Sequence, residues 1–467
     1  MALSRTKRKD VEEMMEELEL EAPAGMAALL AELPAELVNM VEDVADDQLE
    51  LHFHLGGLHS LTKLALGVEG TETVIVTLRI FGGGVVDAFC VHLEQTVGTP
   101  TMSHKWMEIG EVKAPPTWFK CHGKQTRLAY AVARAVWREL KDHELDLAGL
   151  YAHVKDVIQN GANAYLYCGK DIGARLHRTT SCGSMVCNLT ASEGDWGVLT
   201  EILRLDHRAM DLLFTALHAA ASTGNMELLP DFRKMWPDST KLLAALHALP
   251  STDTLAKATG KRIALRSFGK YVDVLAPAVC HVSRNFIISA TGHWRIPNMP
   301  KIHQFLVVDN PPEVEAAFAK HNHIQPRMVL FHGTSMDRLY AILSQGLRVL
   351  SNTPLMKHGA ASGAGIYFST ETSLPASYAA ITSPAVAGHS AFFHSRKDFD
   401  GPQVLLGCEH AGPAKKGGIF VVTDPTKVIV RYIFLVPKGV AFPVAKDIIA
   451  PMVSTFYSLR ASAATSK

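Results

Sequence analysis

A histidine, a glycine and a hydroxyl residue stand next to one another in the segment RMVLFHGTS. His332 follows the short apolar run 328–331, which predicts that its imidazole lies at the end of a β-strand. Gly333 and Thr334 come directly after it. An imidazole beside a hydroxyl and an unhindered backbone is suited to hydrogen-bond a polyhydroxylated ligand. We therefore interpret His332 as a ligand-binding residue, although a single histidine in a protein is more often structural.

The elements around His332 are predicted in the order strand, polar turn, helix and strand. A helix follows Thr334 and ends at Gly346, a typical C-terminal stop. Gly363 and Gly365 then allow a close backbone approach before a short strand that contains Tyr367. The predicted buried face of the helix consists of Leu339, Ile342 and Leu343.

Three of the seven cysteines gather in the segment YLYCGKDIGARLHRTTSCGSMVC. A structural zinc site needs four thiolate or imidazole ligands, typically in two close pairs. Cys182 and Cys187 could form one pair, but Tyr165 stands where Cys168 would need its partner. His177 is the remaining candidate for a fourth ligand. The pattern favours buried thiols or a metal-free remnant over zinc.

Ser362 in HGAASGAG suggests a hydrolase nucleophile as an alternative. A nucleophile elbow needs the pattern GxSxG at a strand-to-helix turn, and the first glycine is misplaced here. The sequence therefore excludes this class.

The motifs FHGTS and GIYFS, with SQGLR between them, resemble the ADP-ribosyltransferase catalytic domain of the poly(ADP-ribose) polymerase superfamily. HQFLVVDNPPEVEAAF (303–318) is similar to the opening strand and helix of that family, and GGIFVVTDPTKVIVRYIFLV (417–436) to its closing strand pair. The divergent mono-ADP-ribosyltransferase branch also carries HQFL, HGAA and a cysteine-rich patch before the catalytic domain. The resemblance covers residues 160–467 and is faint over 1–160.

This resemblance implies a binding site for NAD, which the reaction consumes as a substrate. His332 matches the histidine that hydrogen-bonds the adenosine ribose, and Gly333 the residue whose backbone holds the nicotinamide carboxamide. Thr334 takes the place of a serine that contacts the adenosine ribose. Tyr367 matches the tyrosine of the nicotinamide ribose pocket, and Tyr378 the ring that stacks on nicotinamide.

Arg348 and Ser369 complete the NAD-binding residues that the resemblance implies. The sequence departs from the family at Pro375, where a serine would close on the carboxamide. Ser373 and Ser377 are the candidates to replace that serine.

The third catalytic position of the family falls on Ile419, where polymerising members carry a glutamate. Isoleucine accepts no hydrogen bond and activates no acceptor hydroxyl, so chain elongation should be lost. The resemblance thus implies transfer of a single ADP-ribose unit to a protein side chain, with release of nicotinamide. The chemistry itself requires no metal.

Two rivals remain at this point. Ile419 and Pro375 both fit a catalytically silent scaffold with an NAD pocket, whereas the presence of His332 and Tyr367 counts against it. RNA 2'-phosphotransferases share a distantly similar domain with an HGT turn, but GIYFS is not their hallmark.

The composition indicates a folded chain of several domains. The 467 residues are 48% hydrophobic and 20% charged. The 46 basic and 46 acidic residues cancel, which argues against binding of nucleic acid by overall charge. The odd, dispersed cysteines are typical of a reducing compartment, and no apolar run reaches the length of a membrane span. We expect a soluble protein of the cytosol or nucleus.

The predicted fold class is α+β, in four parts. Residues 1–160 form an N-terminal α+β module, 161–195 a degenerate cysteine-rich patch, 196–289 a helical segment, and 290–467 the split antiparallel sheet of the catalytic domain. The N-terminal module begins with an acidic amphipathic helix at 11–21, continues as an antiparallel meander over about 50–92, and packs a helix at 126–141 on that sheet. It faintly resembles the ubiquitin-conjugating or RWD class, which implies a role in binding a protein partner.

Overall fold

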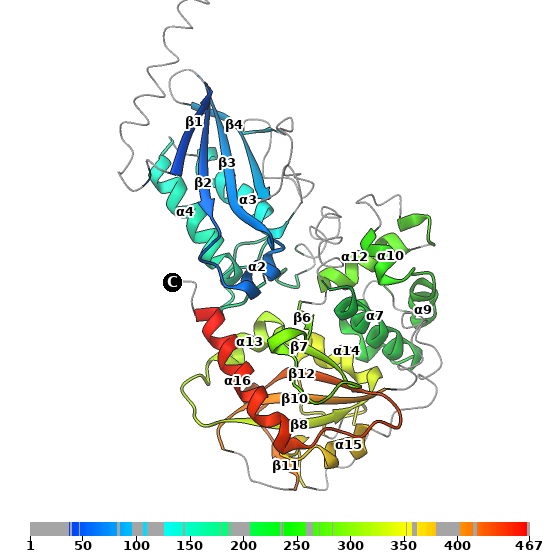
Figure 1. Cartoon of the computed structure of the whole chain (residues 1–467). Helices are drawn as coiled ribbons and strands as arrows, with labels where there is room; N and C mark the ends of the chain where they lie inside the picture. Colours follow the sequence, from blue (N-terminus) through cyan, green and yellow to red (C-terminus); the bar gives the residue numbers. More distant parts are fainter. Residues whose placement is uncertain are drawn as a thin grey trace, which may run out of the picture. The chain divides into compact units, whose positions relative to one another are not determined.

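A computed structural model shows that the chain divides into two compact units, Met1–Gly161 and Ala162–Thr465. Both units combine helices with an antiparallel sheet, which confirms the α+β prediction (Figure 1). The structure describes residues 37, 40–45, 47–81, 85–95, 106–109, 126–142, 145–178, 180–184, 187, 206–233, 236, 238–257, 265–269, 271–282, 284–351, 353–356, 362–379, 402–413 and 418–464. The acidic helix predicted at 11–21 lies outside these residues.

The first unit is a five-stranded antiparallel meander whose strands follow their order in the sequence. Phe53 of β2 stacks on Tyr151 of α4 with ring centroids 4.6 Å apart, so α4 packs on the sheet. The predicted helix at 126–141 is confirmed, and so is the predicted meander over about 50–92 except at its segment SLTKLALGV. The strands are β1 (Val41–Ala45), β2 (Gln48–His54), β3 (Thr71–Phe81), β4 (Val85–Gln95) and β5 (Met107–Glu108); the helices are α2 (Ser60–Leu66), α3 (Arg127–Asp142) and α4 (Leu147–Asn160).

The segment SLTKLALGV was predicted as part of the meander, and this prediction was wrong. It forms α2, whose N-terminus is capped by the His59 side chain and whose C-terminus ends at Gly67 with φ 70°. Leu61 and Ala65 are buried one turn apart, the spacing of a helix face. An apolar run of this length fits either a strand or a helix, and here the two caps decide between them.

The second unit begins with the cysteine segment and a set of helices. Asp206 caps α7 and also accepts a hydrogen bond from the Ser289 hydroxyl at 2.9 Å, which ties this helix to β6. Phe232 of α8 packs edge-on against Tyr340 of α14, with ring centroids 5.7 Å apart. These helices are α7 (His207–Ser222), α8 (Pro230–Arg233), α9 (Ser239–His247), α10 (Thr252–Lys257) and α12 (Val272–Val282), with the 3-10 turn η3 (Met226–Leu228).

A five-stranded antiparallel sheet in the order β6-β7-β12-β10-β8 and a separate pair β11-β9 form the rest of the second unit. The sheet already includes β6, so it begins before residue 290. Its strands are β6 (Phe286–Ser289), β7 (His303–Asp309), β8 (Arg327–Thr334), β10 (Gln403–Ala411) and β12 (Val428–Val436); β9 (Ile366–Phe368) pairs with β11 (Phe420–Val422). The helices are α13 (Pro312–Ala319), α14 (Met336–Gln345), α15 (Ser373–Ala379) and α16 (Ala445–Ala464).

The segment 417–436, predicted as a closing strand pair, contributes two strands that do not pair with each other. β11 pairs with β9, whereas β12 lies between β7 and β10. Every residue of β12 is buried because both its edges and both its faces are covered. Its near-continuous apolar run is the sequence signature of this central position.

Glu409 of β10 lies fully buried among three guanidinium groups. The Arg431 Nε lies 3.4 Å from one of its carboxylate oxygens, the Arg327 Nε lies 3.9 Å from the other, and Arg460 of α16 donates to that second oxygen. Arg431 also donates to Glu315 of α13 at 2.7 Å. Burial lowers the pKa of Arg460 to about 10 and lowers that of Arg327. This cluster joins β8, β10, β12 and two helices.

None of the described helices combines the length and the low charge that a membrane crossing would need.

Candidate active site

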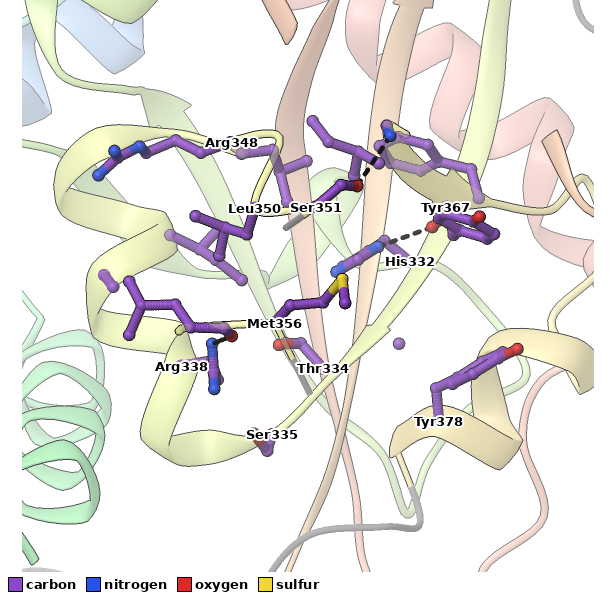
Figure 2. Close-up of a pocket in the computed structure, with 18 of the residues that line it drawn as sticks. His332, Thr334, Ser335, Arg338, Arg348, Leu350, Ser351, Met356, Tyr367 and Tyr378 are labelled. Carbon is purple, nitrogen blue, oxygen red and sulfur yellow. Dashed lines mark hydrogen bonds between the residues drawn. The ribbon is translucent and has the colours of Figure 1, made fainter. Parts of the chain in front are cut away.

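A cleft of about 240 Å³ opens beside β8 in the second unit (Figure 2). Its walls come from β8, α14, the segment after α14, the β9 strand and α15. Seven of the residues predicted as catalytic or NAD-binding line it together: His332, Gly333, Thr334, Arg348, Tyr367, Tyr378 and Ile419. The structure thus brings the three residues predicted as catalytic to one cavity, although they are far apart in the sequence.

The His332 ring is held by the backbone of the neighbouring strand. Its Nδ1 lies 2.9 Å from the carbonyl oxygen of Tyr367. A carbonyl only accepts, so Nδ1 carries the proton and donates. Burial lowers the pKa of His332 below its ordinary value, which the hydrogen bond to Tyr367 offsets in part. The ring is therefore neutral near pH 7, and its Nε2 is left as an acceptor at the cleft.

Gly333 presents backbone groups to the cleft because β8 is an edge strand. Phe331 exchanges both of its backbone hydrogen bonds with Ser369, at 2.8 and 3.0 Å, on the side away from β10. Along an antiparallel strand, successive residues direct these groups to alternate sides. Gly333, two residues further on, therefore directs its N–H and its C=O away from β10 as well, toward the cleft that it lines.

The absence of a side chain at Gly333 allows α15 to approach this strand. A Cβ placed on Gly333 would lie 1.9 Å from the carbonyl oxygen of Pro375. We expect Gly333→Ala to displace α15 together with Tyr378 and to weaken NAD binding at least about tenfold, since overpacking of this kind costs about 1–3 kcal/mol. Calorimetric titration of the full chain with NAD measures the change.

Gly161→Ala is the matched control for this prediction. Gly161 has an ordinary φ of −59°, and a Cβ there would meet its nearest atom, in Val157, at 3.6 Å. The Gly161→Ala variant should bind NAD with the same affinity as the parent. Equal NAD affinity of Gly333→Ala and the parent would contradict the role given to this close approach.

Tyr367 is fixed at the cleft by the loop before its strand. Its hydroxyl donates to the Gly363 carbonyl at 2.6 Å and accepts from the Ser362 N–H at 2.9 Å. Tyr378 extends from α15, below Tyr367 in Figure 2. The two phenol rings belong to the same side of the cleft, and Ile419, which is 39% exposed, lies at its margin just before β11.

Several predicted residues lie elsewhere. Ser369 does not line the cleft: its side chain is buried, and its hydroxyl accepts from the Glu371 N–H at 3.0 Å. Ser373 and Ser377, the candidates to replace the serine lost at Pro375, also lie outside the cleft lining. The Ser377 hydroxyl donates to the Leu374 carbonyl within its own helix at 2.7 Å. Pro375 itself forms part of the wall.

The cleft also contains residues that the sequence interpretation missed. Arg338 of α14 lines it and donates to the Leu355 carbonyl. Ile342, predicted in the buried face of this helix, is only half-buried and lines the cleft instead. Residues four apart on a helix share a face, so Arg338 and Ile342 could have been assigned together. Leu350, Leu355, Met356 and, from η3, Glu227 are among the other lining residues that carried no sequence signal.

The sulfur atoms of Cys168, Cys182 and Cys187 lie within 4.8 Å of one another. His177, the candidate fourth ligand, is engaged elsewhere and does not join them. Its ring nitrogens lie 2.9 Å from Asp309 and 2.7 Å from Ser462. The candidate fourth ligand His177 was therefore wrong, because its imidazole is hydrogen-bonded to the buried Asp309 carboxylate.

Comparisons with known proteins match part of the second unit. Residues 296–408 match the family model of the poly(ADP-ribose) polymerase catalytic domain. The human "Protein mono-ADP-ribosyltransferase PARP8" is 29% identical over 34% of this chain and 21% of its own length. Its mouse counterpart is 33% identical over 21% of this chain and 12% of its own length. The "Protein mono-ADP-ribosyltransferase PARP3" of Gallus gallus is 39% identical over 15% and 12%, respectively.

The edge-strand histidine, the separate β9–β11 pair and the matched segment define an ADP-ribosyltransferase catalytic domain. Residues 296–408 thus carry the sequence of a poly(ADP-ribose) polymerase catalytic domain, and the chain is similar to proteins named as mono-ADP-ribosyltransferases. It spans at most 21% of the length of these relatives.

Proposed function

We propose that this protein transfers a single ADP-ribose unit from NAD to a protein side chain and releases nicotinamide. The observation that carries the proposal is the convergence of His332, Gly333 and Tyr367 on one cleft. The names of the curated relatives describe the same reaction class.

The backbone of Gly333 is the proposed site for the nicotinamide carboxamide. A carboxamide carries one donor group and one acceptor group, and Gly333 directs one acceptor and one donor to the cleft. The pairing resembles the addition of a further strand at the edge of the sheet. Tyr378 would stack on the nicotinamide ring, and Tyr367 would form the wall at the adjoining ribose.

The neutral His332 ring is the proposed partner of the adenosine ribose. Its Nε2 accepts a hydrogen bond from a ribose hydroxyl while Nδ1 donates to Tyr367. Thr334 adds a second hydroxyl beside it. Arg338 and Arg348 are the cationic residues of the cleft lining, and their charge favours the pyrophosphate between the two riboses.

In the proposed reaction the bond between C1' of the ribose and the nicotinamide nitrogen breaks. Nicotinamide leaves with the bonding electron pair, the acceptor side chain forms the new bond at C1', and the acceptor loses its proton. The transition state resembles an oxocarbenium ion, which the pyrophosphate charge helps to stabilise. The protein contributes by holding NAD in the geometry that favours this state.

Ile419 is proposed to limit the product to one unit. A further transfer needs a group that activates a ribose hydroxyl of the unit already attached, and an aliphatic side chain cannot accept that proton. We expect labelled NAD to give a product with a single ADP-ribose on a denaturing gel. A ladder of polymer from the unaltered chain would contradict this role of Ile419.

Two substitutions sharpen the test at this position. Ile419→Glu supplies a carboxylate, whereas Ile419→Gln supplies a hydrogen-bond acceptor of similar size without a base. Longer products from Ile419→Glu but not from Ile419→Gln are expected if the missing base is what limits the chain.

A catalytically silent NAD-binding scaffold is the second candidate, favoured by Pro375 and Ile419 at positions where active polymerases differ. In that case the unaltered chain would bind NAD and label no acceptor, and only Ile419→Glu would show activity. Proteolytic digestion of the labelled product, followed by mass spectrometry of the peptides, would also identify the modified side chain.

A further inference from the structure

Three cysteine sulfur atoms lie close together in the segment 164–187. In the sequence this segment follows the strands of the first unit and precedes those of the second, and none of the three cysteines lines the proposed NAD cleft. The sulfur atoms belong to Cys168, Cys182 and Cys187 and lie within 4.8 Å of one another. Tetrahedral zinc with Zn–S bonds of about 2.3 Å holds its sulfur ligands about 3.8 Å apart. The cluster would need to contract by about 1 Å or less to hold such an ion.

Cys168 lies in a tight hairpin turn. The Tyr165 N–H donates to the Lys170 carbonyl at 3.0 Å, and the Gly169 N–H donates back to the Tyr165 carbonyl at 2.8 Å. Gly169 has φ 70°, a left-handed conformation that a side chain would disfavour. The chain therefore reverses directly after the thiol.

Cys182 likewise lies beside a bend of the chain. It is followed by Gly183, whose φ of 75° is also left-handed. The Leu166 N–H donates to the Thr180 carbonyl at 3.0 Å and so holds the turn and the bend together. The Cys187 N–H donates to the Ser184 hydroxyl at 3.2 Å. Cys168 and Cys182 each precede a glycine in the left-handed conformation, and their sulfur atoms lie within 4.8 Å of each other and of that of Cys187.

The cysteine segment has little else to hold it in one conformation. Over the described residues between 164 and 187, regular pairing is limited to the bridge between Ala164 and Asp171. Its buried apolar residues are Leu166, Ile172, Leu176 and Cys187. Ordering a backbone costs about 1–2 kcal/mol per residue, which so small an apolar core does not offset. Segments of this kind usually depend on a cross-link or a metal ion.

The ordered segment is nevertheless attached to the catalytic sheet. The backbone N–H groups of His177 and Arg178 both donate to one carboxylate oxygen of Asp309, at 2.8 and 2.9 Å. Asp309 ends β7, and the His177 ring reaches Ser462 of α16. An interaction that holds the cysteine segment in one conformation therefore also holds the contacts of His177 and Arg178 with Asp309.

We propose that Cys168, Cys182 and Cys187 bind one zinc ion as thiolates, and that the ion holds the turn and the bend that dock His177 onto the sheet. Soft thiolate ligands favour zinc among the common divalent metals. Within the described part of the chain no fourth histidine, cysteine or carboxylate joins the group. The fourth tetrahedral position is left to water or another donor. This site is independent of the proposed transferase activity.

The zinc content of the purified full chain tests the proposal. Elemental analysis by mass spectrometry should find about one zinc ion per chain. Cys182→Ser and Cys187→Ser should each lower the zinc content at least about tenfold, because two thiolates and a hydroxyl bind zinc far more weakly. The control is Cys90→Ala, a buried cysteine of β4 in the first unit, which should keep the full zinc content.

A second measurement uses only the unaltered chain and so does not depend on whether a variant folds. Three thiols should become reactive toward a coloured disulfide reagent after a chelator is added, and cobalt substitution should give the visible absorption of a tetrahedral thiolate site. A zinc content no higher than that of Cys182→Ser would overturn the proposal. So would a disulfide between two of the three cysteines, detected by peptide mapping.

Discussion

Replacing His332 by alanine is expected to lower the labelling of acceptors from NAD by at least about 100-fold, the loss that a small displacement of a bound substrate causes. The substitution removes the Nε2 acceptor that the proposed ribose contact uses, and also the hydrogen bond from Nδ1 to Tyr367 that aligns the two motifs. Single-turnover labelling with radioactive NAD measures the effect.

Two further variants separate this role from a merely structural one. His332→Gln places an oxygen near the position of Nε2 and should restore part of the labelling that alanine abolishes. His321→Ala removes a histidine of the same unit that bonds Thr426 at 2.8 Å and does not line the cleft. Its labelling should stay within about twofold of the parent, as expected for a surface change. If His332→Ala labels as well as the parent, the site is misassigned.

Replacing Glu409 by alanine is expected to destabilise the second unit by about 3–5 kcal/mol, the cost of removing one partner from a buried ion pair. Arg431 would keep its ion pair with Glu315, whereas Arg327 and Arg460 would lose the Glu409 carboxylate that they approach. Thermal unfolding, together with hydrogen exchange of the β10 and β12 amides, measures the loss in the strands concerned.

The matched control is Glu313→Ala, which also removes an arginine partner. Glu313 pairs with Arg284 at 2.7 Å, but its side chain is 52% exposed. Exposed pairs contribute at most about 1 kcal/mol, so hydrogen exchange should hardly change. Comparable losses of stability for Glu313→Ala and Glu409→Ala would mean that burial does not determine how much the ion pairs of Glu409 stabilise the unit.

Much of the cleft could be predicted because its motifs are local. His332, Gly333 and the helix after them follow one another in the sequence, and α14 ends at Gly346 as its glycine indicates. Ser369 was misplaced because the sequence does not show which way a residue at the end of a strand faces. Its backbone, rather than its side chain, serves the site by pairing with Phe331.

Features that depend on distant pairing could not be predicted. The sequence suggested that residues 417–436 form a pair, yet β11 and β12 find partners elsewhere because each contacts strands far away in the chain. Likewise, the sequence grouped Cys168, Cys182 and Cys187 as a weak zinc candidate but favoured buried thiols, and it did not show that the three sulfur atoms meet. Nor does it show that Asp309 occupies the ring of His177.

The position of β12 in the sheet has a consequence for how the protein is made. Among the described strands of this sheet β12 is the last to leave the ribosome, yet it fills the gap between β7 and β10. Until it arrives, the nascent chain carries unpaired apolar strand edges, which invite pairing with other chains. Chaperones that shield such edges would therefore act before this sheet is complete.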